Sequence, residues 1–173
     1  MDDAIERSIR FLRSRQRADG SFAGFWGINF TYAIFHVMKG LCAAGVPSHD
    51  PVNMRAAEWL MTKQRADGGW GEHFSGCLTG RYVEHPQSQV VMTSWALLAL
   101  MEVLPHTAPA VTRGIEFLHS QQTADGGWPS QAVNGVFFGS AMLDYRLYKT
   151  YFPAWALARY AALGPQLAPI LVS

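Results

Sequence analysis

Apolar residues recur at helical spacing over three segments of the chain, residues 4–17, 52–64 and 108–122. Polar residues fill the opposite face of each segment, and good helix formers are frequent in all three. This arrangement is typical of a surface helix that packs one stripe of side chains against a core. The pattern therefore predicts three amphipathic outer helices.

Three further segments are apolar nearly all round: residues 29–45, 89–104 and about 139–163. A helix that is apolar on every side is a buried helix. Each of these segments is therefore predicted to be an inner helix that pairs with the outer helix before it. Pro153 is expected to break or kink the last inner helix, because proline lacks the amide hydrogen that a helix interior needs.

One pattern recurs where each outer helix ends: aromatic-Leu-x-x-x-Gln-x-Ala-Asp-Gly-x-aromatic, with its glutamines at Gln16, Gln64 and Gln122. Glycine accepts the left-handed conformation that closes a helix, and aspartate tolerates turn geometry. The glutamine amide is expected to satisfy backbone groups near the helix end, and the final aromatic residue to fold back over it. A pattern with this many fixed positions in three copies indicates a repeat architecture.

The repeats divide the chain into about three αα-hairpins, residues 4–45, 52–104 and 108–163. Hairpins with buried inner helices stack into a solenoid or close into a ring. At roughly fifty residues each, six hairpins would need about 300 residues, whereas this chain has 173. The sequence therefore predicts an all-α fold that is part of an α/α toroid, a half ring with inner-helix surface left exposed at its edge.

Composition and charge narrow the functions that such a fold can carry. The chain has 14 Lys and Arg against 13 Asp and Glu, so no net charge attracts it to nucleic acid. Cys42 and Cys77 lack metal-ligand and disulfide spacing, and we expect packed thiols in a reducing compartment. The six histidines form no metal-ligand set. No stretch approaches the roughly 18 apolar residues of a membrane span.

Four stretches are more specific than the helical pattern: QRADGSFAGFWGINFTY at 16–32, ADGGWGEHFSGC at 66–77, SQVVMTSWALLAL at 88–100 and NGVFFGSAMLDYRLYKTYFPAWALARY at 134–160. They resemble the squalene and oxidosqualene cyclases, and most closely the oxidosqualene branch of the lanosterol-synthase type. The repeat itself is similar to the Gln-Trp motif of that family. The resemblance extends from about residue 5 to residue 163.

The resemblance implies that the chain is the C-terminal part of a triterpene cyclase that converts (3S)-2,3-oxidosqualene to a sterol-type tetracycle. In this family two α/α barrels enclose a cavity, an aspartic acid protonates the epoxide, and a carbocation cascade follows without a metal or a redox cofactor. The family takes its substrate from lipid. The resemblance therefore also implies a peripheral or monotopic membrane contact on the cytoplasmic side.

Such a cascade needs aromatic faces that stabilise positive charge in a cavity that excludes water. By matching position, Trp95 resembles the family's pocket tryptophan, and Phe137 resembles the aromatic residue that stabilises the late cation. Tyr145 and Tyr148 match two tyrosines at the pocket rim. Without the resemblance, all four would be interpreted as core aromatics of a helical toroid.

The chain departs from the family at the acid. Asn29 stands where sterol-type enzymes have a cysteine that hydrogen-bonds the catalytic acid, although its amide could hold a carboxyl group similarly. The Asp-Cys-Thr-Ala-Glu run that carries this acid does not occur in the sequence. Asp144 follows an apolar run, where burial would raise its pKa, but it matches a position at which the family varies. The sequence therefore predicts no catalytic acid in this chain and no activity of the chain by itself.

Two alternatives remain. The chain could be a non-catalytic toroid module that binds a hydrophobic ligand or a partner protein, or it could belong to a cyclase for another polyene, such as a meroterpenoid precursor. As a cyclase segment, it would act on a triterpenoid or squalene-epoxide substrate, together with the missing N-terminal part of the cyclase or by self-association. The product does not follow from the sequence, because single pocket changes redirect the cascade.

Overall fold

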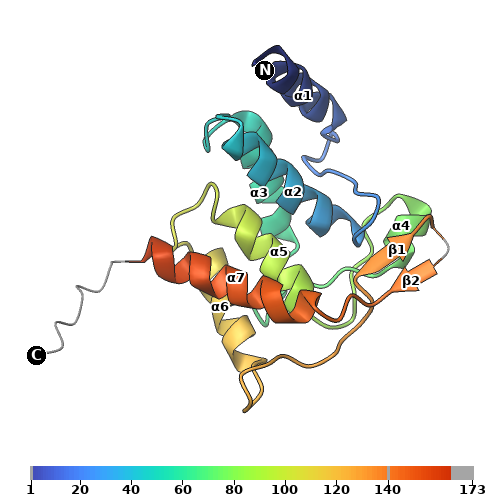
Figure 1. The fold of residues 1–173 in the computed structure, drawn as a ribbon, viewed down its shortest axis with the longest axis vertical. Helices are drawn as coiled ribbons and strands as arrows, with labels where there is room; N and C mark the ends of the chain where they lie inside the picture. The colour runs from blue at the N-terminus through green and yellow to red at the C-terminus, as the bar shows by residue number, and fades with distance from the viewer. Residues whose placement is uncertain (1, 140, 165–173) are drawn as a thin grey trace, which may run out of the picture.

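The computed structural model describes residues 2–139 and 141–164, which are mostly helical (Figure 1). The described elements are, in chain order, α1 (Asp2–Arg15), α2 (Asn29–Ala43), α3 (Pro51–Thr62), α4 (Ser75–Thr79), α5 (Val90–Leu100), α6 (Pro109–Ser120), β1 (Gly135–Phe137), β2 (Ala141–Leu143) and α7 (Tyr148–Leu163). The expected alternation of outer helices α1, α3 and α6 with inner helices α2, α5 and α7 is present.

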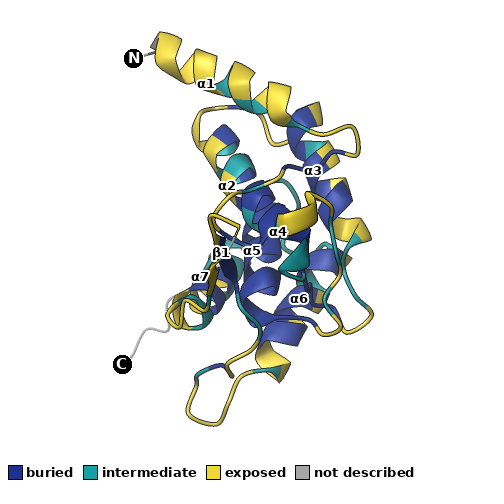
Figure 2. Cartoon of the chain, turned by 90° about the vertical axis from the view of Figure 1, so that its right-hand side faces the viewer, coloured by how far each residue is buried: buried dark blue, intermediate teal, exposed yellow. Residues whose placement is uncertain are grey.

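Helix α5 is the centre of the core. Every one of its residues is buried, as the all-round apolar sequence predicts, and it packs against α2, α3, α6 and α7. Burial falls off away from α5, and α1 presents mostly exposed residues (Figure 2). In α7 only Phe152, Pro153 and Ala156 are buried. The last inner helix therefore lies at an edge of the described fold.

The expected start of the last inner helix was wrong. The inner helix begins at Tyr148 rather than near residue 139, because residues 135–137 and 141–143 form the antiparallel pair β1–β2, in which Val136 is opposite Met142. Glycine favours this turn, since Gly139 has a φ of 69°. Helix α7 also continues through Pro153 to Leu163 without a break. Pro153 lies near the start of the helix, where it removes a single backbone hydrogen bond.

The three repeat turns share one geometry. The turn glycines all have left-handed backbones: Gly20 (φ 91°), Gly68 (φ 87°) and Gly126 (φ 83°). In the first two turns the glutamine amide donates to the glycine carbonyl and to a carbonyl at the start of the next outer helix, at 2.8 to 3.0 Å: Gln16 to Gly20 and Val52, Gln64 to Gly68 and Ala110. The indole N–H of the closing tryptophan returns to its own outer helix: Trp70 to Leu60, Trp128 to Leu118. Gln16 and Gln64 thus each join one hairpin to the next.

The third turn differs because no fourth outer helix follows it in the described chain. There, Gln122 Nε2 donates to the Gly126 carbonyl at 2.9 Å, and no second acceptor is found among the described residues. A Cβ atom added to Gly68 would lie 2.5 Å from the Arg113 carbonyl oxygen, whereas one added to Gly126 would meet nothing within 4 Å. The third turn is therefore the open end of the repeat.

This difference predicts unequal costs for the same substitution in two turns. Gln64→Ala removes two hydrogen bonds to backbone carbonyls and one from the Arg113 guanidinium, so it should lower the free energy of unfolding by about 2 kcal/mol. Gln122→Ala removes one exposed hydrogen bond and should cost about 0.5 kcal/mol. Urea unfolding of both variants checks the difference, and equal costs would contradict the proposed role of Gln64 as a link between hairpins.

Candidate functional site

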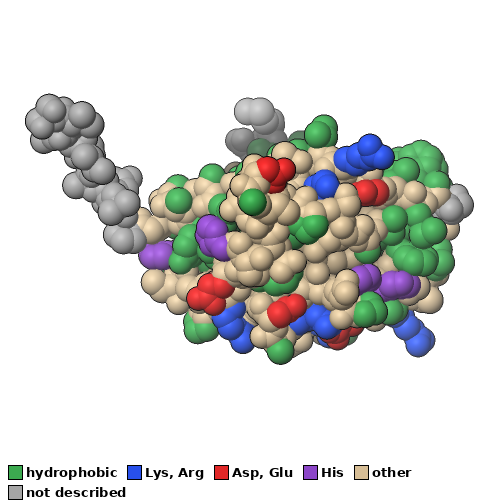
Figure 3. Space-filling view, turned by 90° about the horizontal axis from the view of Figure 1, so that it is seen from below, with side chains coloured by type: hydrophobic (Ala, Val, Ile, Leu, Met, Phe, Trp, Pro, Cys, Tyr) green, Lys and Arg blue, Asp and Glu red, His purple; other side chains and the backbone are tan. Residues whose placement is uncertain are grey.

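Four aromatic side chains meet where the loop before α2 lies against β1, and we call Phe25, Trp26, Phe137 and Phe138 the aromatic tetrad. Ring centroids are 4.8 Å apart for Trp26 and Phe137 and 4.3 Å apart for Phe137 and Phe138. All four rings are substantially exposed, from 37% for Phe137 to 64% for Phe25. Hydrophobic side chains gather at this end of the molecule, where Figure 1 places β1 and β2 (Figure 3). The tetrad is therefore an aromatic surface and not part of the packed core.

Backbone pairing holds the two halves of the tetrad together. The amide of Val136 donates to the Trp26 carbonyl at 3.1 Å, and the amide of Ile28 donates to the Asn134 carbonyl at 3.1 Å. Gly27 and Gly135 form an isolated antiparallel bridge between these bonds. The loop before α2 thus runs beside β1 like a further strand, which fixes side chains about 110 residues apart in the sequence against one another.

A second group of aromatic rings, here called the inner cluster, consists of Tyr32, Trp95, Tyr145, Tyr148 and Phe152. The Trp95 ring makes edge contacts with Tyr32 at 5.2 Å, Phe152 at 5.5 Å and Tyr148 at 5.9 Å between centroids. Tyr145 stacks on Tyr148 at 4.7 Å. These rings come from α2, α5, the turn before α7, and α7. The three inner helices therefore contribute to one aromatic wall.

Two glycines allow the tetrad and the inner cluster to meet. A Cβ atom at Gly27 would lie 2.3 Å from the Tyr32 ring, and one at Gly135 would lie 3.1 Å from the Tyr145 ring. Any side chain at Gly27 would thus displace Tyr32. The bare backbone of the bridge lies against the two tyrosines, so the inner cluster borders the tetrad, and we call the two together the aromatic face.

Tyr32 and Tyr148 keep their protons at neutral pH. Burial raises the pKa of Tyr32, and the nearby Tyr145 raises it further. Burial also raises the pKa of Tyr148, with smaller contributions from neighbouring tyrosines. Neutral phenols offer their π-faces to a cation without presenting a phenolate that would trap it.

The structure places the predicted site residues in three environments. Trp95 is completely buried beneath the tyrosines, and its indole N–H has no partner among the described residues. Tyr148 is half-buried, while Tyr145 and Phe137 are 39% and 37% exposed. Trp95, Tyr145 and Tyr148 belong to the inner cluster, and Phe137 belongs to the tetrad. Their roles in binding remain a prediction.

Asn29 begins α2 and is buried. Its side-chain oxygen accepts from the Gly24 amide at 2.8 Å, and its Nδ2 donates to the Gly76 carbonyl at 3.4 Å. The side chain therefore holds the loop at Gly24 and the short helix α4 to the start of α2. The second Nδ2 hydrogen is the group that remains for a carboxyl partner.

The sequence reasoning missed Glu72, which is 1% exposed. Its carboxyl oxygens accept from the amides of Phe30 and Thr31 at 3.0 to 3.1 Å and from the Thr31 hydroxyl at 3.1 Å. Burial raises the pKa of Glu72, and these hydrogen bonds oppose that effect. An acidic residue at a helix N-terminus is a favourable cap, so Glu72 fixes the start of α2 and with it Asn29. Its only sequence signal was a charge in a glycine-rich loop.

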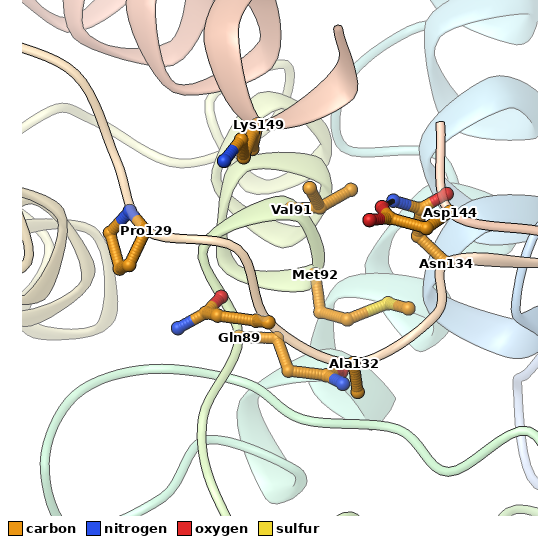
Figure 4. Close-up of a pocket in the computed structure, with 9 residues that line it drawn as sticks. Gln89, Val91, Met92, Pro129, Ala132, Asn134, Asp144 and Lys149 are labelled. Carbon is orange, nitrogen blue, oxygen red and sulfur yellow. Dashed lines mark hydrogen bonds between the residues drawn. The ribbon is translucent and has the colours of Figure 1, made fainter. Parts of the chain in front are cut away.

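Asp144 is exposed, contrary to the burial considered for it from the sequence. It accepts from Asn134 Nδ2 at 3.3 Å, beside a small cavity between the start of α5 and the start of α7 (Figure 4). This cavity has a volume of about 10 Å³, which is roughly the space of one water molecule. It includes Gln89, whose Nε2 has no partner among the described residues. The cavity can hold a water molecule but no polyene.

The two cysteines are free and half-buried, as expected for packed thiols. Burial raises the pKa of Cys77 to about 11. Within residues 2–139 and 141–164, no cluster of three or more metal-ligating side chains is found. In the same residues no helix is long and apolar enough to span a bilayer.

A family model decides the affiliation: the model described as the squalene-hopene cyclase C-terminal domain matches residues 1–162. The chain belongs to this family of cyclases. The match covers nearly the whole chain, which agrees with the resemblance drawn from its motifs.

Curated members of this cyclase family are similar over most of the chain. Lanosterol synthase of Homo sapiens is 37% identical over 170 residues, which are 96% of this chain and 23% of that protein. Cycloartenol synthase of Dictyostelium discoideum is 46% identical, over 92% of this chain and 23% of that protein. A probable squalene–hopene cyclase of Sinorhizobium fredii is 41% identical, over 92% and 25% respectively. The chain therefore spans about a quarter of the length of these cyclases.

Solved structures confirm the terpene-cyclase fold. A variant of the type II terpene cyclase MstE from Scytonema, in complex with geranylgeranyl dihydroxybenzoate, superposes with a TM-score of 0.74 at 20% sequence identity. The superposition covers 94% of this cyclase segment and 51% of the MstE chain. The likeness is consistent with the predicted α/α toroid.

Proposed function

We propose that this chain supplies one wall of a cavity in which a triterpene cyclase converts 2,3-oxidosqualene to a sterol-type tetracycle. The observation that carries the proposal is the aromatic face, in which the inner cluster borders the tetrad at the Gly27–Gly135 bridge, in a chain that belongs to the cyclase family. The catalytic acid would come from the remainder of the enzyme, since the Asp-Cys-Thr-Ala-Glu run does not occur here.

The chemistry fits this face. A cyclising polyene carries positive charge from ring to ring, and aromatic π-faces stabilise it by about 0.5 to 2 kcal/mol each when desolvated. Trp95 would support the wall from beneath through its contacts with Tyr32 and Tyr148. Phe137 would face the late cation. Because the substrate is a lipid, we place the complete enzyme at the cytoplasmic side of a membrane.

The exposure of the tetrad also favours a second candidate function, a binding module without catalysis. Rings that are up to 64% exposed can bind a hydrophobic ligand or a partner surface in this chain alone. Such a module would bind polyenes or sterols and leave them unchanged.

A chimeric enzyme tests the cyclase proposal. The corresponding C-terminal segment of the Dictyostelium cycloartenol synthase, which is 46% identical over 160 residues, would be replaced by this chain. We expect the chimera to convert 2,3-oxidosqualene to a cyclic triterpenoid, detected by gas chromatography with mass spectrometry. The chain alone should give no product, because the Asp-Cys-Thr-Ala-Glu run that carries the family's acid does not occur in it.

Two controls make the result decisive. A chimera in which the aspartate of the acid motif is changed to asparagine should be inactive while remaining folded. A folded chimera that binds 2,3-oxidosqualene but never cyclises it would contradict the cyclase proposal and favour the binding module. Turnover of the epoxide by the isolated chain would contradict the expected need for an external acid.

A further inference from the structure

Phe138 holds a backbone conformation that its side chain disfavours. Its φ is 48°, and in the described part of the chain it is the one residue other than glycine with a positive φ. A bulky L-residue in this region is strained, because its Cβ crowds the backbone carbonyl. Glycine adopts the same conformation without this cost, as the next residue, Gly139 (φ 69°), does.

Burial does not compensate for this strain, because the Phe138 ring is 63% exposed. Ring contacts to the rest of the tetrad hold it instead: Phe137 at 4.3 Å, Trp26 at 5.6 Å and Phe25 at 6.1 Å between centroids. Phe25 is equally exposed, at 64%, and contacts Trp26 edge-on at 5.9 Å. Phe25 and Phe138 therefore extend the aromatic face beyond Trp26 and Phe137 at a cost to stability.

We propose that Phe138 and Phe25 are specificity-determining residues that bind one end of the isoprenoid polyene and favour a cationic over a neutral end group. This inference rests on the proposed function, because it assigns these residues to the same site. Strain that persists at an exposed position points to a role in binding, since strained conformations concentrate at ligand sites and stability is commonly lost there.

The arrangement of the Phe138 and Phe25 rings suits them to bind a charged group. Phe138 lies between Phe137 and Phe25, and neighbouring rings of the tetrad meet at angles between 52° and 85°. Tilted rings turn their faces toward different sides of a small volume, which lets more than one π-face approach the same charge. A ligand that reaches Phe137 along the inner cluster would next meet Phe138.

The test compares stability and binding in the isolated chain. Phe138→Gly and Phe25→Ala would be measured beside Phe11→Ala, which removes a ring that is 54% exposed on α1, outside the tetrad. The probes are protonated N,N-dimethylfarnesylamine and its uncharged counterpart, farnesyl methyl ether. Equilibrium dialysis with mass spectrometry gives the dissociation constants, and thermal unfolding gives the melting temperatures.

We expect Phe138→Gly to weaken binding of the amine by about five- to ten-fold, and that of the ether by less. Its melting temperature should be unchanged or higher by about 2 °C, because the substitution relieves strain. Phe25→Ala should weaken amine binding by about three-fold. Phe11→Ala should leave both dissociation constants unchanged.

Several outcomes would overturn the proposal. If the wild-type chain binds the amine and Phe138→Gly and Phe25→Ala bind it equally well, this inference would be contradicted. The cyclase proposal would be unaffected by that result. Weaker binding with a lower melting temperature in Phe138→Gly would contradict the strain argument and overturn this inference too. A wild-type chain that binds neither probe would contradict ligand binding by the aromatic face, and this inference would fail with it.

Discussion

Gly68→Ala should lower the free energy of unfolding by about 3 kcal/mol, whereas Gly126→Ala in the equivalent turn should cost about 1 kcal/mol. Both glycines have left-handed backbones, with φ of 87° and 83°, so both substitutions introduce similar conformational strain. Only Gly68 is packed against the next outer helix, where the new Cβ atom would lie 2.5 Å from the Arg113 carbonyl oxygen. Because that neighbour is backbone, a side-chain rotation cannot relieve the overlap.

Urea unfolding at neutral pH checks this pair of variants. Gly20→Ala is a second positive case, since its Cβ atom would lie 2.6 Å from the Arg55 carbonyl oxygen. Equal losses in the free energy of unfolding at Gly68 and Gly126 would mean that the left-handed turn alone requires glycine. The close packing of successive hairpins would then not explain the requirement. A loss confined to Gly20 and Gly68 would show that the repeat glycines serve the contact between hairpins.

Glu72→Gln should destabilise the chain, by about 2 to 3 kcal/mol at the pH where the loss is largest. The carboxyl group accepts hydrogen bonds from Phe30 and Thr31 through both of its oxygens and is 1% exposed. An amide of the same shape turns an N–H group toward backbone N–H groups, so at least one buried donor loses its acceptor. The start of α2, which carries Asn29, should loosen with it.

The free energy of unfolding lost in Glu72→Gln should depend on pH. Burial, the largest cause, raises the pKa of Glu72 in the folded chain above its unfolded value of about 4.3. The folded state therefore binds this proton more tightly than the unfolded state does. The stability that comes from this tighter proton binding is fully present below about pH 4.3 and is lost as the pH rises through the folded pKa. The difference between wild type and Glu72→Gln should thus shrink as the pH rises from about 4 toward neutrality.

Glu84→Gln is the matched control, because Glu84 pairs with Glu72 in an isolated bridge but keeps a side chain that is 56% exposed. It makes a surface ion pair with Arg65, so the substitution should cost less than about 1 kcal/mol. Hydrogen exchange of the Phe30 and Thr31 amides should accelerate in Glu72→Gln and stay unchanged in Glu84→Gln. Unchanged exchange in both variants would contradict the capping role of Glu72.

The repeat was readable from the sequence because its signals are local. Helical periodicity identified α5 as a buried helix, and the Asp-Gly steps marked the left-handed turns at Gly20, Gly68 and Gly126. The pattern failed in the third hairpin because an apolar run of strand length cannot be separated from a helix by periodicity alone. Residues 135–137 and 141–143 form a hairpin since the loop before α2 offers them backbone partners from far away in the sequence.

Local periodicity in the sequence predicted helical hairpins, and the resemblance of its motifs to the oxidosqualene cyclases indicated the family and the candidate aromatics Trp95, Phe137, Tyr145 and Tyr148. Long-range packing settled where each of these aromatics lies. Trp95 is buried beneath tyrosines, whereas Phe137 is at the surface and contacts Trp26. Long-range packing also assigned Glu72 to the start of α2. Such contacts join segments tens of residues apart, and no local pattern encodes which distant side chain will fill a given space.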